Sequence, residues 1–147
     1  MEPSEDRVLA ALDRLVLAAV GVTTVALAES GEGHDLTLSQ WRALVVISSS
    51  TGLRASELAQ RIGMSRPSMS RLVRRLERRG VIVAEQDPND GRATILRATS
   101  TGVAVRVAMM ARRRELMTDA LATRPGSLPR DLASGLDAIA EVLERYT

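Results

Sequence analysis

Cysteine, lysine and phenylalanine are absent from the 147-residue sequence, and histidine occurs once, as His34. The lack of cysteine excludes disulfides, thiolate metal sites and thiol-based redox sensing. A single histidine argues against a histidine-rich metal site and against a nucleophile–histidine triad. Because no set of nucleophile, base or metal ligands assembles from the other residues, we expect no enzyme activity, no metal and no cofactor.

Charge is distributed unevenly along the chain, although the formal net charge is only +2. Residues 54–80 contain eight arginines and two glutamates, a net charge of +6, whereas residues 1–35 contain seven acids and two arginines, a net charge of −5. A local basic block of this kind is typical of nucleic-acid-binding proteins. All twenty basic residues are arginine, which we interpret as coding bias. Length and composition fit one soluble domain, with or without helical extensions.

The stretch Leu15–Ala28 carries no charge. Its fourteen residues are too few to span a bilayer as a helix, and the acidic segment before it is unlike the basic start of a signal peptide. We therefore interpret it as part of an interface helix, expect no membrane association, and place the protein in the cytoplasm.

Apolar residues at helical spacing, from Val8 to Ala26, predict one long helix over residues 4–29. A turn at Gly31–Gly33 ends it, and a second helix with Ser39 near its start runs to the Ser48–Gly52 stretch. Residues 55–62 predict a short helix that Gly63 stops.

Ser65 is expected to cap the next helix, with Pro67 in its first turn and Gly80 as its stop. A short helix, a three-residue turn and a second helix of these lengths predict a helix-turn-helix. Strands 81–85 and 93–97, joined by the turn Asp87–Arg92, would follow as a hairpin. Thr99 is then expected to cap a helix over 99–123, before a last helix over 128–146. The predicted fold is mainly α with a small β-hairpin wing.

The helix over 66–79 is expected to have two distinct faces. Met69, Leu72, Val73 and Leu76 form an inward apolar stripe, and the opposite face presents Pro67, Ser70, Arg71, Arg74, Arg75 and Arg78. Such a face suits the major groove of DNA, with the first turns at base edges and later arginines at phosphates. The alternative is an arginine face that is only solvated. We favour DNA binding because the helix stands between a helix-turn and a hairpin.

Arg92 follows the hairpin turn, where a long cation can enter a narrow minor groove. Asp90 is positioned to orient it through a charge-assisted hydrogen bond. The alternative is that both are ordinary surface residues of a hairpin.

Segments 36–44, 56–59, 72–80, 90–92 and 99–102 together resemble the MarR family of winged helix-turn-helix regulators. The resemblance implies a homodimer whose N- and C-terminal helices interlock, so that two winged modules bind a pseudo-palindromic operator on double-stranded DNA. It implies that Ser65–Arg75 lie at the major groove and Arg92 at the minor groove. It also implies a repressor that a small aromatic or phenolic effector releases.

From the residues and the resemblance together, the candidate DNA contacts are Ser65, Arg66, Pro67, Ser68, Ser70, Arg71, Arg74, Arg75, Asp90 and Arg92. Residues 36–99 would form the winged helix-turn-helix DNA-binding lobe, and residues 1–35 and 100–147 the dimerisation region. Ala84, Glu85 and Gly91 depart from the residues that the family often has in its wing. The wing is therefore expected to make fewer DNA contacts.

The terminal helices carry apolar faces that one small domain does not cover, which favours a dimer over an intramolecular bundle. Two functional alternatives use the same residues. A nonspecific DNA-binding protein would need the same arginines, and a helical protein-interaction module would use the apolar faces to bind a partner.

Overall fold

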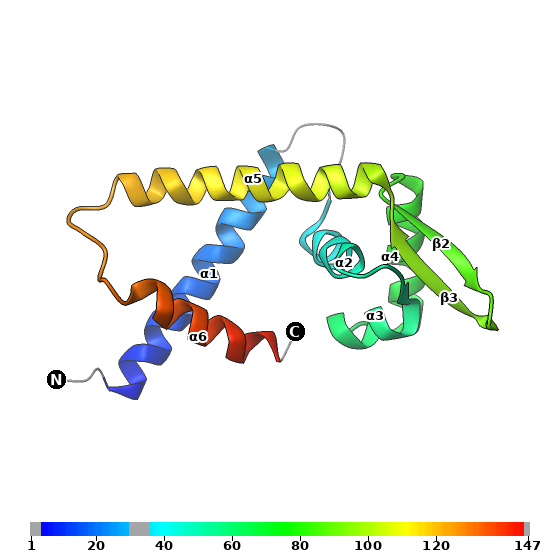
Figure 1. Cartoon of the computed structure of the whole chain (residues 1–147), viewed down its shortest axis with the longest axis horizontal. Coiled ribbons are helices and arrows are strands. Elements are labelled where there is room, and N and C mark those ends of the chain that lie inside the picture. Colours follow the sequence, from blue (N-terminus) through cyan, green and yellow to red (C-terminus); the bar gives the residue numbers. More distant parts are fainter. Residues whose placement is uncertain (1–3, 30–35, 146–147) are drawn as a thin grey trace.

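The structure, a computed structural model, describes residues 4–29 and 36–145 and is mainly helical. Its elements in chain order are α1 (Glu5–Glu29), α2 (Leu38–Ser48), β1 (Leu53–Arg54), α3 (Ala55–Ile62), α4 (Arg66–Arg78), β2 (Ile82–Asp87), β3 (Asp90–Ala98), α5 (Ser100–Ala122) and α6 (Leu132–Glu144). Helices α2–α4 and the β2–β3 hairpin gather at one end of α5, and α1 and α6 lie toward its other end (Figure 1). The predicted winged helix-turn-helix fold is confirmed. The predicted turn at Gly31–Gly33 and His34 lie outside the described residues.

The second helix is capped by Thr37, and Ser39 lies near its start as expected. The Thr37 hydroxyl accepts a hydrogen bond from the backbone N–H of Gln40 (3.3 Å), and the Gln40 side chain accepts one from the backbone N–H of Thr37 (3.0 Å). This reciprocal capping box satisfies two backbone donors at the start of α2.

The helix-turn-helix has the predicted boundaries. Gly63 ends α3 and Gly80 follows α4, each with φ of +67°, a left-handed conformation that glycine adopts without steric cost. Ser65 is the N-cap of α4 and Pro67 lies in its first turn. The expected side-chain cap is wrong, because the Ser65 hydroxyl donates to the Ser68 hydroxyl (3.1 Å) and accepts no backbone N–H.

The hairpin belongs to a three-stranded antiparallel sheet in the order β1-β3-β2. Strand β1, which the sequence analysis missed, pairs Leu53 with Leu96 and Arg54 with Ile95. Strands β2 and β3 also reach further toward the tip than predicted, so that only Pro88 and Asn89 lie between them. The register shifts between Gln86 and Asp87, where the tip begins.

The start of α5 is fixed against the end of the hairpin. The Thr99 hydroxyl accepts from the Gly102 backbone N–H (3.0 Å) and donates to the Gly80 carbonyl (2.6 Å), which confirms Thr99 as the cap. Gly102 packs so closely that a Cβ there would lie 2.0 Å from the Val81 carbonyl oxygen. The first turn of α5 is thereby joined to the winged region through backbone contacts.

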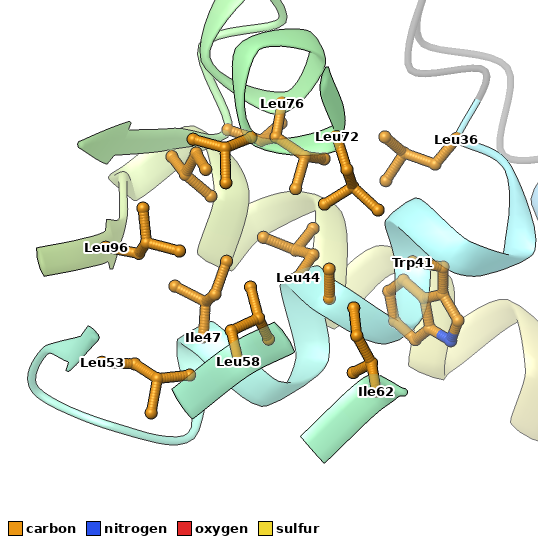
Figure 2. Packing of buried hydrophobic residues seen from close by; sticks show 14 of the residues in the cluster. Leu36, Trp41, Leu44, Ile47, Leu53, Leu58, Ile62, Leu72, Leu76 and Leu96 are labelled. Atoms are coloured by element: carbon orange, nitrogen blue, oxygen red, sulfur yellow. The ribbon is translucent and has the colours of Figure 1, made fainter. Parts of the chain in front are cut away.

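Most of the hydrophobic core lies in the winged region, and Ala26 and Leu27 of α1 and Met109 of α5 belong to the same cluster. Side chains from α2, α3, α4 and the sheet converge on Leu44, which is fully buried, and Leu72 and Leu76 point from α4 toward it (Figure 2). The inward stripe predicted for α4, namely Met69, Leu72, Val73 and Leu76, is buried. This packing fixes which face of α4 points away from the core.

Helices α1, α5 and α6 leave much of their apolar surface exposed. The exposed large side chains include Leu9, Leu15, Val16 and Leu17 on α1, Val107 and Leu121 on α5, and Leu136, Val142 and Leu143 on α6. An apolar groove of about 880 Å³ runs between α1 and α6 and is lined by Leu12, Leu15, Leu132, Leu136 and Ile139 among others. The last helix begins at Leu132, four residues later than predicted.

By length and composition, α1 is the one helix among the described residues that could cross a membrane. The 25-residue helix is longer than its uncharged stretch, so the length argument from Leu15–Ala28 does not apply to α1 as a whole. Helices buried in the cores of soluble proteins pass the same test. Near its C-terminal end, α1 packs on α5, where Arg112 pairs with Glu29 (2.6 Å) and with Glu115 (2.9 Å).

Candidate nucleic-acid interface

The outer face of α4 is a continuous basic surface. Of the candidate residues on this helix and its cap, Ser68 is half-buried, and Ser65, Arg66, Pro67, Ser70, Arg71, Arg74 and Arg75 are exposed. Among residues 4–29 and 36–145, these four arginines form no ion pair. Their guanidinium groups are therefore free to bind an anionic partner.

Serine hydroxyls hold two of these arginines along the helix. Arg71 donates to the Ser68 hydroxyl (3.3 Å) and Arg74 donates to the Ser70 hydroxyl (3.0 Å). Each bond leaves the other guanidinium donors of its arginine unoccupied. The serines thus limit the freedom of the arginines without neutralising their charge.

A groove of about 730 Å³ separates α4 from the wing. Four arginines line it: Arg54 from the end of β1, Arg66 and Arg74 from α4, and Arg92 from β3. Ser70 also lines it, as do two acids, Glu77 and Asp90. Of the predicted residues, the structure thus brings Arg66, Ser70 and Arg74 to the helix side of this groove and Asp90 and Arg92 to its wing side. Ser68, Arg71 and Arg75 instead line a separate hollow of about 240 Å³ between α4 and the start of α2.

Glu77 has a structural role in addition to its charge. Its carboxylate accepts a hydrogen bond from the backbone N–H of Ala84 (3.2 Å), which ties α4 to β2. Because a neutral N–H donor leaves the carboxylate charged, Glu77 still offsets one of the arginines that line the groove.

The proposed orientation of Arg92 by Asp90 takes a different form from the one expected. The Asp90 carboxylate accepts a hydrogen bond from the backbone N–H of Arg92 (3.1 Å), and no ion pair joins the two side chains in the described part of the chain. Asp90 therefore shapes the backbone at the tip of the wing and leaves the Arg92 guanidinium free.

Sequence reasoning missed the pair that holds the wing to the helices. Arg54 donates to the Asp87 carboxylate (2.7 Å), and its second terminal nitrogen lies 4.0 Å from Asp90. The backbone N–H of Asn89 (2.9 Å), followed by the Arg54 guanidinium, holds the pKa of the Asp87 carboxyl below its ordinary value. The sequence offered two weak signals for this pair. Arg54 stands just before a helix, and Asp87 stands just before a proline.

The comparisons with known proteins agree with this geometry. Residues 34–93 match a family model described as "MarR family". The match makes residues 34–93 similar to the MarR family. Members of this family are DNA-binding transcriptional regulators and not enzymes. The match covers the helix-turn-helix and the start of the wing, which are the parts of the chain that form the basic groove.

Curated relatives match about half of the chain. The homoprotocatechuate degradative operon repressor of Escherichia coli is 32% identical over 72 residues, which cover 49% of this chain and 49% of the relative. The chain thus matches about half the length of the curated relatives. The operon in that name is the one that the Escherichia coli protein represses, and it is said of that protein alone.

Solved structures match nearly the whole chain. RV1404 from Mycobacterium tuberculosis superposes with a TM-score of 0.81 at 23% identity, over 97% of this chain and 95% of that one. The transcriptional regulator PA4135 superposes with a TM-score of 0.68 at 26% identity, over 97% of this chain and 98% of that one. The fold shared with these two structures therefore includes the terminal helices.

Proposed function

We propose that this protein is a homodimeric, sequence-specific DNA-binding transcriptional regulator, a repressor that binds a pseudo-palindromic operator. The observation that carries the proposal is the basic groove between α4 and the wing, where Arg66 and Arg74 line one side and Arg92 the other. These three arginines are exposed and form no ion pair in the described chain. A rigid helix whose inner face is buried in the core can present such a surface to duplex DNA at a fixed angle.

The proposal assigns different roles to the two sides of the groove. Ser65–Arg75 would lie at the major groove, with Arg71 at a base edge and Arg74 and Arg75 at phosphates. Arg92 would enter the adjacent minor groove, and Asp90 would fix the backbone beside it. Residues 36–99 would form the DNA-binding lobe and residues 1–35 and 100–147 the dimerisation region.

The uncovered apolar faces of α1, α5 and α6 support the dimer. Contiguous exposed apolar surface on a soluble protein marks an interaction site, and a second copy would offer a matching surface across a two-fold axis. Two winged lobes related in this way would meet half-sites about 10 bp apart. A soluble, cytoplasmic location belongs to the same proposal, because burial of α1 in the dimer would remove its apolar surface from solvent.

Release by a small aromatic or phenolic effector is the remaining part of the proposal. Its support is the similarity to the MarR family, together with a curated relative named as the repressor of a degradative operon. The test is the loss of operator binding when candidate aromatic acids and phenols are added to the preformed complex. If no member of such a panel changes the affinity, this part of the proposal is wrong.

Fluorescence anisotropy tests the DNA-binding proposal directly. The purified protein would be titrated into the intergenic DNA beside its own gene and into a scrambled duplex of equal length, across a salt series. We expect a saturable preference for the native fragment that persists near physiological salt. The log–log salt slope should be close to −0.9 for each phosphate contact.

The same titration separates the alternatives. Equal and salt-labile binding to both duplexes would favour a nonspecific DNA-binding protein, which could use the same arginines. No binding to either duplex would favour a protein-interaction module, for which the exposed apolar helices are the supporting observation. A genome-wide selection of bound fragments would distinguish a nonspecific protein from a specific one whose operator lies elsewhere.

A further inference from the structure

The Arg54–Asp87 pair joins segments that are 33 residues apart in the chain. Arg54 ends β1 and is the N-cap residue of α3, whereas Asp87 ends β2 at the tip of the wing. The Arg54 side chain is 49% exposed, but the Asp87 side chain is only 8% exposed. The carboxylate is therefore enclosed at the tip, and one of its partners comes from the helical body.

Both oxygens of the Asp87 carboxylate are in use. One accepts from Arg54 (2.7 Å), and the other accepts from the backbone N–H of Asn89 (2.9 Å), which closes the turn. The second terminal nitrogen of Arg54 lies 4.0 Å from Asp90, whose other oxygen accepts from the backbone N–H of Arg92. A connected path of polar contacts thus runs from Arg54 to the backbone of Arg92.

The sheet itself does not extend this support to the tip. Strand β1 pairs with β3 only at Leu96 and Ile95, and beyond that point the hairpin is held by its own two strands. The ladder is also irregular between Gln86 and Asp87. Among the ion pairs and strand pairings of the described residues, the Arg54–Asp87 pair is therefore the attachment between wing and helices that lies nearest the tip.

We propose that Arg54 is a positioning residue that acts through Asp87 to hold Arg92 at the separation from α4 that DNA binding requires. The inference rests on the proposed function, since Arg92 must contact DNA for its position to matter. Arg54 lines the same groove, so a direct phosphate contact is the competing role that the test must separate.

Asp87→Asn separates the two roles by the sign of its effect. Removing a carboxylate beside a polyanion strengthens binding when only charge matters, and a released Arg54 would add a cation to the groove. The positioning role predicts the opposite, a loss of about three- to tenfold in operator affinity, because the wing must be ordered on binding. Glu85→Gln is the matched control, since it removes one exposed carboxylate from the same hairpin without touching Asp87 and should bind at least as tightly.

Two further variants complete the test by anisotropy on the same operator. Arg54→Lys retains a cation for Asp87 and should keep most of the affinity, whereas Arg54→Gln should lose about as much as Asp87→Asn. In an Arg92→Ala background, Asp87→Asn should change affinity less than about twofold, because these residues act as a unit. An undiminished effect in that background overturns the proposal, as does an Asp87→Asn variant that binds as tightly as the unmodified protein.

Hydrogen exchange of the free protein provides a readout that needs no DNA. Arg54→Gln should speed amide exchange in residues 86–94 by about tenfold and leave α4 unchanged, since only the wing loses an attachment. Unchanged exchange in the wing would contradict the positioning role even if DNA affinity fell. Failure of the proposed function gives a different result, because the unmodified protein would then show no preference for the operator over the scrambled duplex. Failure of the positioning role leaves that preference intact and removes only the effects of the Arg54 and Asp87 variants.

Discussion

Gly102→Ala is expected to destabilise the protein, although alanine is the better helix former. Gly102 lies in the first turn of α5, and a Cβ there would be 2.0 Å from the Val81 carbonyl oxygen and 2.9 Å from its carbonyl carbon. Both atoms belong to the backbone, so no side-chain rotation relieves the contact. Leu44, at 3.3 Å, closes the remaining side.

The magnitude follows from the movement that the methyl group would force. Non-bonded heavy atoms settle at about 3.5 Å, so the start of α5 must move by about 1–1.5 Å from Val81. Overpacking of a rigid site costs about 1–3 kcal/mol. The Thr99–Gly80 hydrogen bond would weaken as well, at about 0.5–1.5 kcal/mol. The gain in helix propensity returns about 1 kcal/mol, so we expect a net loss of about 0.5–3.5 kcal/mol.

Thermal unfolding at a fixed protein concentration measures this loss. A change of about 0.5–3.5 kcal/mol should lower the Tm by about 1–14 °C for a chain of this size. Gly21→Ala is the control, because Gly21 lies in the middle of α1 with no heavy atom within 4 Å of an added Cβ. The control should stabilise by up to about 1 kcal/mol. If Gly102→Ala raised the Tm as Gly21→Ala does, the close packing of α5 on Val81 would be wrong.

Three further predictions concern the apolar groove between α1 and α6, helix α4 and the wing. Leu136→Glu places a charge in the apolar groove between α1 and α6 and should convert the dimer to monomer in sedimentation; an unchanged dimer would remove this groove from the interface. Arg71→Ala should weaken operator binding more than random-DNA binding, and equal losses in anisotropy would exclude a base contact. The lowered pKa of Asp87 means that its ionised carboxylate stabilises the folded protein above the unfolded-state pKa of about 3.9. This stabilisation is lost as the pH falls through the lower pKa that Asp87 has in the folded state. The difference in Tm between the unmodified protein and Asp87→Asn should therefore narrow below about pH 4, and a constant difference would refute that origin.

Local signals were sufficient to predict α4 and its flanking turns. The spacing of Met69, Leu72, Val73 and Leu76 identifies the buried face, because side chains three and four apart share one side of a helix. Gly63 and Gly80 mark the helix ends because each adopts a left-handed backbone. The exposed arginines then follow by geometry, without knowledge of any distant contact.

The wing could be predicted only in outline, since its details depend on distant partners. Strand β1 is two residues long and has no periodicity of its own, so it becomes a strand only by pairing with Leu96 and Ile95. The turn was predicted too long because Asp87 reads as a turn residue in sequence. In the structure its carboxylate is satisfied by Asn89 and Arg54, which lets β2 continue to the tip.

The distribution of burial gives the two halves of the chain different sources of stability. The winged region has a core of its own around Leu44, whereas α6 has no buried residue and α1 has buried residues only from Thr23 onward. The winged region can therefore hold its shape within one copy, and the terminal helices would gain their burial in the proposed dimer. Helix α5 connects the two, fixed at one end by Thr99 and Gly102 and further along by Arg112 and Glu29. Because both attachments act on one helix, a shift in the packing of the two copies of the proposed dimer would change the separation of their basic grooves, and with it the fit to half-sites.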